Sequence, residues 1–177
     1  MNAKVGSTVM HAVLASFAIG CGGGNSPDAA GGGTASISVN DATYEVADVG
    51  MTIDAGEEPW FRIDGQPVEH PEEDCVPGLS GGLGLYGELP PSVRQASDLA
   101  GKRLRVQFSG DGDDANFCFV GMGGLAGAEE AWITIDSVSG ARVRFSMSGT
   151  FKVYDENGEG PIVTATASGT ALLRAES

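Results

Sequence analysis

The stretch AWITIDSVSGARVRFSMSGTFKVYDENGEG, residues 131–160, decides the fold class of this chain. Apolar residues occupy every second position in three runs of it, at 131–137, 142–148 and 150–155. Such alternation is typical of a β-strand with one buried face, because successive side chains point to opposite sides of a sheet. The stretch therefore predicts three β-strands in succession.

Two short turns separate these strands from each other and from the next one. Ser139-Gly140 lies between the first two runs, and Asn157-Gly158 follows the third. An Asn-Gly pair favours a two-residue hairpin, since both central residues of a type I′ turn need a positive φ. We therefore expect an antiparallel meander that continues into a strand at 161–173.

The same alternation predicts strands in the rest of the chain after Thr34. They are expected near 35–40, 43–47, 50–54, 59–64, 103–109 and 115–121. Residues 65–101, which hold most of the prolines, are predicted to form a long loop or irregular crossover, with a single helical turn or short helix at 92–100. Many short strands with glycine-rich turns indicate an all-β domain. We expect an antiparallel β-sandwich, with a β-barrel as the alternative.

The composition limits the function classes. The 177 residues suit one domain. Ten Lys and Arg stand against 24 Asp and Glu, a net charge of −14, which argues against a nucleic-acid partner because such a partner requires a basic surface. The sequence contains no phosphate-binding loop, dinucleotide fingerprint or C-x-x-C pair, and we expect a protein that is not an enzyme.

The first residues are typical of an export signal. Lys4 precedes an apolar run from Val9 to Ile19, which is shorter than the roughly 20 residues that a membrane-spanning helix needs. A positive start, a short apolar middle and small residues at the end indicate a secretory signal peptide.

The end of this run, Phe17-Ala18-Ile19-Gly20-Cys21, resembles the lipobox of bacterial lipoproteins. The resemblance implies cleavage after Gly20 and acylation of Cys21 with chains such as palmitate, although Ala18 stands where the family usually has Leu. Gly22 replaces the Asp that retains such proteins at the inner membrane, which implies sorting to the outer membrane. An ordinary signal peptide with a chance cysteine is the alternative.

These features divide the chain into three parts. Residues 1–20 are expected to be a lipoprotein signal peptide, and residues 21–33 an acylated cysteine with a disordered, flexible glycine-rich tether. Residues 34–177 are expected to form a single β domain. The predicted location is the cell envelope, on the outer membrane, facing the periplasm or the cell surface. The membrane would be a partner through the acyl chains.

The two remaining cysteines are candidates for a disulfide. If Cys21 is acylated, Cys75 and Cys118 are left as a pair, and an exported protein meets an oxidising compartment. A bridge between them would close a loop of about 44 residues and stabilise the fold by roughly 4 kcal/mol in the chain-entropy model. Two free thiols are the alternative.

One segment is a candidate for metal binding. Asp111, Asp113, Asp114 and Asn116 place oxygen atoms closely enough for a calcium ion, whereas a polar hairpin turn would use the same residues. We expect no other cofactor.

Other chemistry-bearing residues have simpler interpretations. The aromatic side chains of Trp60, Phe61, Tyr86 and Trp132 fit either a sugar-binding platform or core packing. The G-x-S-x-G pattern at 78–82 is interpreted as a glycine-rich loop, because no helical segment follows it. His70 lies among acids at 69–74 that could bind a metal, but a single histidine is a poor zinc set, and we interpret the segment as a solvated acidic loop.

Two further stretches resemble known domains. Ala131–Ala175 resembles the closing strands of secreted β-sandwich domains of unknown function in bacterial lipoproteins, which implies a fold without an activity. Asp98–Val106, followed by Gly110–Gly112, is similar to strands of jelly-roll carbohydrate-binding modules. We therefore predict a lipid-anchored envelope protein with a structural or binding role and a glycan or an envelope protein as partner. The alternative is a carbohydrate-binding module, with or without calcium.

Overall fold

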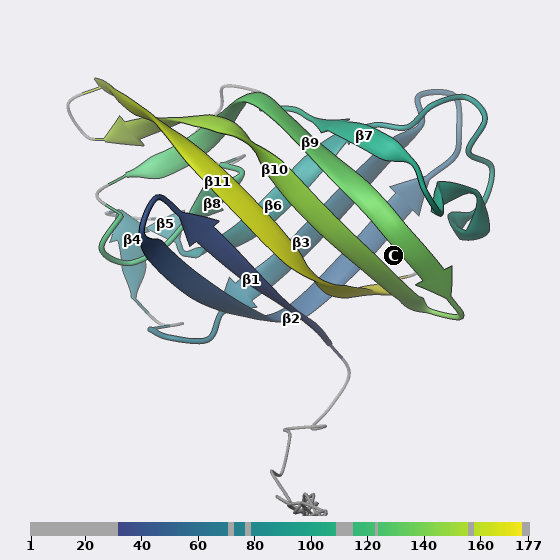
Figure 1. Ribbon diagram of the computed structural model, residues 1–177, viewed down its shortest axis with the longest axis horizontal. Coiled ribbons are helices and arrows are strands. Elements are labelled where there is room, and N and C mark those ends of the chain that lie inside the picture. Colours follow the sequence, from purple (N-terminus) through teal and green to yellow (C-terminus); the bar gives the residue numbers. More distant parts are fainter. Residues whose placement is uncertain are drawn as a thin grey trace, which may run out of the picture.

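The computed structural model describes residues 32–70, 73–76, 79–108, 115–122, 124–155 and 158–174. They form an all-β structure with one short 3-10 helix (Figure 1). The elements are β1 (Gly33–Val39), β2 (Ala42–Asp54), β3 (Trp60–Pro67), β4 (Asp74–Val76), β5 (Leu79–Ser80), β6 (Gly82–Glu88), η1 (Ala96–Leu99), β7 (Arg103–Val106), β8 (Phe117–Cys118), β9 (Leu125–Ser139), β10 (Arg142–Asp155) and β11 (Gly158–Leu173).

The main sheet closes on itself. Its order is β10-β11-β1-β2-β3-β6-β8-β9, and β9 pairs back onto β10. Neighbouring strands are antiparallel, except that β11 meets β2 in parallel where β1 has not yet begun. The antiparallel all-β class is thus confirmed, and the closed eight-stranded barrel, the alternative expectation, is found in place of the sandwich. A sandwich would leave two open edges on each sheet, whereas here β9 and β10 join what would have been edges.

One of the eight positions in the ring is divided between two strands. β7 pairs with β9 at Arg103↔Thr134, and β8 pairs with the same strand at Phe117↔Ala126. Both run antiparallel to β9, so they act as a single strand interrupted by residues 107–116. On the other side β8 pairs with β6, and Gln107 bridges to Tyr86.

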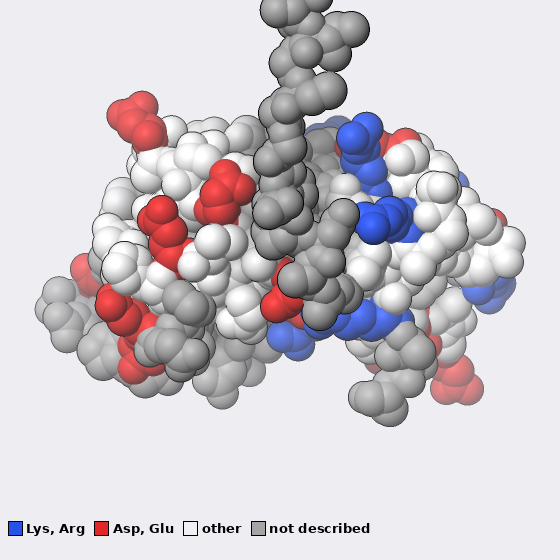
Figure 2. Space-filling view, turned by 90° about the horizontal axis from the view of Figure 1, so that it is seen from below, with Lys and Arg blue, Asp and Glu red and all other residues white. Residues whose placement is uncertain are grey.

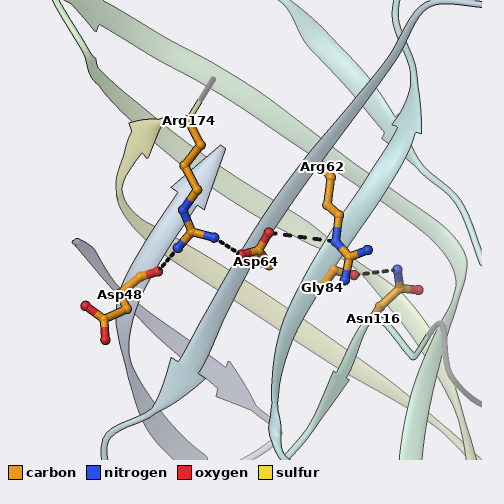
Figure 3. A network of polar contacts seen from close by, with 6 residues as sticks. All are labelled: Asp48, Arg62, Asp64, Gly84, Asn116 and Arg174. Atoms are coloured by element: carbon orange, nitrogen blue, oxygen red, sulfur yellow. Dashed lines mark hydrogen bonds and ion pairs between the residues drawn. The ribbon is translucent and has the colours of Figure 1, made fainter. Parts of the chain in front are cut away.

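The side chain of Asn116 fills the gap that this interruption leaves. Its Nδ2 donates to the carbonyl oxygens of Gly84 at 3.1 Å and Gln107 at 2.9 Å, and its Oδ1 accepts from the backbone N–H of Ala128 at 2.6 Å. Figure 3 shows its contact with Gly84 on the neighbouring strand. Asn116 is the one fully buried polar residue of the described chain, and its amide replaces ladder bonds that a continuous strand would make.

Side chains fill the interior of the barrel. Phe61, Phe117, Phe145 and Phe151 are fully buried there, and the rings of Phe117 and Phe151 lie 4.7 Å apart. An interior of eight strands is just wide enough for such packing. Several inward positions of β1 and β11 carry small residues, which leave room for the phenylalanine rings. These residues are Ala35, Ala165, Ala167, Gly169 and Ala171.

The observed elements differ from the expected ones most of all in residues 65–101. An antiparallel meander at the end of the chain is confirmed, and η1 is the single turn that was expected. The strands expected at 142–148 and 150–155 form the one strand β10, and those expected at 43–47 and 50–54 form the one strand β2. The prediction of a loop or irregular crossover across 65–101 is wrong, because β6 occupies the middle of it and pairs with β3. The inward residues Leu83 and Leu85 alternate with glycine and tyrosine, and glycine carries no polar side chain that would reveal an outer face.

Arg174 ties the end of β11 to β2 and β3. Its guanidinium donates to the carboxylate of Asp64 and, at 2.6 Å, to the carbonyl oxygen of Asp48 (Figure 3). Asp48 has a φ of 51°, within a bulge of β2 that turns this carbonyl toward the arginine. Gly50 lies directly beneath it, and a Cβ there would lie 2.0 Å from Nε of Arg174 and would displace the guanidinium from these contacts.

Replacing Asn116 should weaken the barrel more than an ordinary polar substitution. Asn116→Ala would leave two buried carbonyl oxygens and one N–H unpaired, and we expect the free energy of unfolding to fall by about 2–4 kcal/mol. Chemical denaturation measures the change. Gln66→Ala, which removes an exposed amide from β3, is the matched control and should change it by less than about 0.5 kcal/mol. An equal loss of unfolding free energy in both variants would contradict the role of Asn116 in the barrel wall.

Candidate functional site

A shallow depression on the outer face of β3 and β6 combines aromatic and polar side chains. Trp60 and Arg62 alternate with the buried Phe61 and therefore point outward from β3. Opposite them on β6, Glu88 pairs with Trp60 and Tyr86 pairs with Arg62. The depression has a volume of about 270 Å³.

Strand pairing fixes the shape of this depression. Trp60 and Tyr86 are diagonal neighbours across two strands, a spacing of about 7–8 Å between Cα atoms. On the far side, the N–H of Gln107 donates to the carbonyl oxygen of Tyr86 at 2.8 Å, and its side chain donates to Glu88 at 3.4 Å. The polar groups are thus held beside the indole of Trp60, which is 37% exposed.

Only part of the expected aromatic platform comes together. Trp60 and Tyr86 line the depression, while Phe61 faces the core and contributes no exposed ring. Trp132 lies on β9, with β7 between it and β6, and Arg103 lies over its ring at 4.5 Å from the centroid. The sequence reasoning missed Arg62, Glu88 and Gln107. The alternation around Trp60 could have indicated Arg62, but the other two depend on strand pairing.

A second hollow lies at the end of the barrel that carries the β1–β2 turn. It has a volume of about 670 Å³ and is lined by residues of that turn and of the β10–β11 hairpin and by Gly121 and Met122. Tyr44, Met122 and Val153 form apolar walls, and Asp41 and Asp155 stand at its rim. Tyr44 stacks on Phe119 with ring centroids 4.5 Å apart, which fixes one wall.

The predicted calcium ligands are largely outside the described residues. Asp111, Asp113 and Asp114 fall in the part of the chain that the structure does not describe. Asn116 is described, and all of its side-chain bonds given above go to the backbone of the barrel. Within the described ranges, no three His, Cys, Asp or Glu side chains are grouped to hold a metal ion. The calcium site stays a prediction that rests on the three acids.

The two other predicted chemical features lie apart from the depression. His70, with a φ of 57°, is exposed, and its Nδ1 lies 3.2 Å from Oε1 of Glu73. Ser80 belongs to β5, and Gly78 lies outside the described residues. Cys21 and the rest of the first 31 residues also lie outside them.

Cys75 and Cys118 form a disulfide, as the pairing of cysteines predicted. Their Cα atoms lie 5.8 Å apart, and 43 positions separate them in the sequence. Cys75 belongs to β4, which pairs with β5 in a small separate sheet, and Cys118 belongs to β8 in the barrel. The bridge therefore fastens the small sheet to the divided strand.

Comparison with known proteins identifies no relative. No family model, no curated protein and no solved structure matches the chain. In the described segments, no helix has the length and apolar character needed to span a membrane. The arguments for function therefore come from the sequence pattern and from the geometry above.

Removal of the disulfide should destabilise the barrel strongly. In a Cys21→Ser background, the further change Cys75→Ser should lower the free energy of unfolding by about 4 kcal/mol, because the unfolded chain regains the freedom of a long loop. Denaturant titration of the two proteins measures the difference. Cys21→Ser by itself keeps the bridge between Cys75 and Cys118 and is the control. Its free energy of unfolding should equal that of the protein with all three cysteines. A small difference, or an equal effect of Cys21→Ser alone, would contradict a structural bridge.

Proposed function

We propose that the chain is a lipid-anchored protein of the cell envelope whose barrel serves as a binding domain and not as an enzyme. The observation that carries the proposal is the sequence from Phe17 to Gly33. It contains the lipobox-like end of an apolar run, a cysteine and a glycine-rich linker that leads directly into β1. As a flexible chain, residues 22–33 would span roughly 20 Å, which keeps the barrel close to the membrane.

The filled interior supports a role for the outer surface. An eight-stranded barrel accepts a ligand inside only where side chains leave room for it. Here the rings of Phe61, Phe117 and Phe145 occupy that space. A ligand or partner would therefore bind to the outer face of the strands or at an end of the barrel.

Carbohydrate binding is the second candidate, and the depression at Trp60 favours it. A sugar ring presents an apolar C–H face that packs on an indole, and its hydroxyl groups need donors and acceptors around the rim. Arg62 supplies donors, Glu88 supplies acceptors and Gln107 supplies both. The volume suits one sugar ring at the end or side of a glycan. If this binding requires calcium, the segment that contains Asp111, Asp113 and Asp114 would hold the ion.

The lipid anchor predicts a specific modification. The N-terminal peptide of the mature protein should begin at Cys21 and carry acyl chains, which mass spectrometry of the native protein measures. Cys21→Ser removes the residue that carries the lipid anchor and should move the protein from the membrane fraction to the soluble fraction. Ser26→Ala, a change in the linker, is the control and should leave the protein in membranes. Cleavage at another position, or an unmodified Cys21, would contradict the anchor.

The sugar-binding candidate predicts a loss of affinity when the indole is removed. A glycan array with the full mature protein would identify a ligand, and Trp60→Ala should weaken its binding by about tenfold or more. Ile162→Ala removes another exposed apolar side chain, from β11, and is the matched control that should bind normally. Binding that survives a calcium chelator would assign recognition to the depression alone. An array that stays silent with and without calcium argues against this candidate.

A further inference from the structure

Basic side chains are concentrated on one part of this acidic protein. The mature chain would carry nine basic residues against 24 acidic ones, and four of the basic ones are arginines on two strands that flank β9. These are Arg103 and Arg105 on β7 and Arg142 and Arg144 on β10. We call them the arginine face.

Strand geometry places the four side chains on one outer surface. Each alternates with a buried apolar residue, such as Leu104 on β7 and Val143 on β10, and each is exposed. Thr134 of β9 pairs with Arg103 on one side and with Ser146 of β10 on the other. Arg103 and Arg144 are therefore two strand spacings apart across the sheet, about 10 Å, and offset by two residues along it, while Arg105 and Arg142 lie further apart.

The guanidinium groups of the arginine face are available to a partner. Among the described residues none of the four forms an ion pair, whereas Arg62 and Arg174 both contact Asp64. Arg103 lies over the ring of Trp132. Two acids, Asp136 and Glu45, line the groove that Arg144 enters, and Asp136 accepts a hydrogen bond from Ser146 at 3.3 Å. Nearby Asp98 is engaged with the backbone N–H of Arg94, which lowers the pKa of its carboxyl.

The tether reaches the barrel beside the arginine face. Thr34, directly after the start of β1, pairs with Thr170 of β11, which in turn pairs with Arg144. The three residues line one groove of about 460 Å³. The point where the linker enters the barrel is thus only two strand spacings, or about 10 Å, from Arg144.

Acidic residues lie at both ends of the barrel, with Asp54 and Asp98 toward the end of the arginine face and Asp41 and Asp155 at the opposite end. Asp155 lies 11 positions beyond Arg144 on β10, which corresponds to about 36 Å along an extended strand. In the view of Figure 2 the basic side chains lie mainly toward the right, whereas acidic ones lie on both sides. The Debye length in physiological salt is about 8 Å, so the acids of the far end do not cancel the field of the arginine face.

We propose that the arginine face docks on the anionic lipid headgroups of the membrane that holds the tether, and so fixes the orientation of the barrel. This inference rests on the proposed acyl anchor. The anchor holds the start of β1 roughly 20 Å from the headgroups, and Arg144 lies about 10 Å from that point, which makes docking an intramolecular step. Each arginine at an anionic surface should favour the docked state by about fivefold.

The two tryptophans of the chain report on this orientation. Trp132 lies under Arg103 in the arginine face, while Trp60 lies three strand positions away around the barrel. Trp60→Phe leaves Trp132 as the only tryptophan, and Trp132→Phe leaves Trp60. Both proteins would be purified in full acylated form and inserted into vesicles of phosphatidylcholine, with or without phosphatidylglycerol. Quenching by acrylamide, which carries no charge, then measures the exposure of each indole.

We expect phosphatidylglycerol to protect Trp132 from acrylamide and to leave Trp60 unchanged, and high salt to reverse the protection. Arg142→Gln with Arg144→Gln should reduce the ratio of docked to undocked protein by about 25-fold and so remove the protection. Lys152→Gln, at the acidic end of β10, is the control and should retain it. Mass spectrometry and thermal unfolding of each variant verify acylation and folding.

The outcomes that overturn the inference are distinct from a failure of the anchor. Equal quenching of Trp132 on both kinds of vesicle, in protein shown to be acylated, overturns docking and leaves the anchor intact. Protein without acyl chains overturns both. Protection of Trp132 by soluble dextran sulfate but not by phosphatidylglycerol vesicles also overturns lipid docking, and assigns the arginine face to an anionic polysaccharide.

Discussion

A side-chain amide in the wall of the barrel performs the task of a peptide group. Where the strand between β6 and β9 is interrupted, the side chain of Asn116 donates two hydrogen bonds and accepts one. All three partners are backbone groups: Gly84 of β6, Ala128 of β9 and Gln107 at the start of the interruption. No apolar residue could do this, because a buried ladder with unpaired groups is costly. The ring of strands closes through this residue.

Several other features depend on the same closure. Two residues after Asn116, Cys118 enters the disulfide that holds β4 and β5. Before it, Gln107 turns its carbonyl to Asn116 and its side chain to the depression at Trp60. Phe108 then packs over Gly127 of β9, where a Cβ would lie 2.5 Å from its ring. The interruption therefore brings the disulfide, the depression and the start of the Asp111 loop into one region.

The fold class could be predicted from the sequence, but the closure could not. Alternation in 131–155 gives the same signal for a strand in a sandwich and a strand in a barrel, since both bury one face. The difference lies in β6, whose glycines hide its alternation, and in β7 and β8, which read as two strands while they fill one position. Asn116 resembled a calcium ligand because its sequence neighbours are acidic, whereas its role depends on residues 32 positions earlier and 12 later.

The residues of the candidate sites were likewise predictable only in part. Trp60 and Tyr86 could be singled out from their residue type, and the pairing of Cys75 with Cys118 from the number of cysteines. Glu88 and Gln107 join them only through strand register, which sequence spacing does not give. The arginine face is similar: its members lie almost 40 positions apart in the chain, and β9 alone makes them neighbours.

The ring of strands has a consequence for a protein that would be crowded with its own copies on a bilayer. Each of the eight positions in the described barrel is hydrogen-bonded to a neighbour on both sides. An open sheet presents a row of unpaired backbone groups that a second copy can extend, which is a common origin of aggregation. In the described barrel wall such an edge is confined to β7, which pairs with β9 and is joined to β6 by the bridge of Gln107 to Tyr86, so most of the wall offers no template to a neighbouring copy.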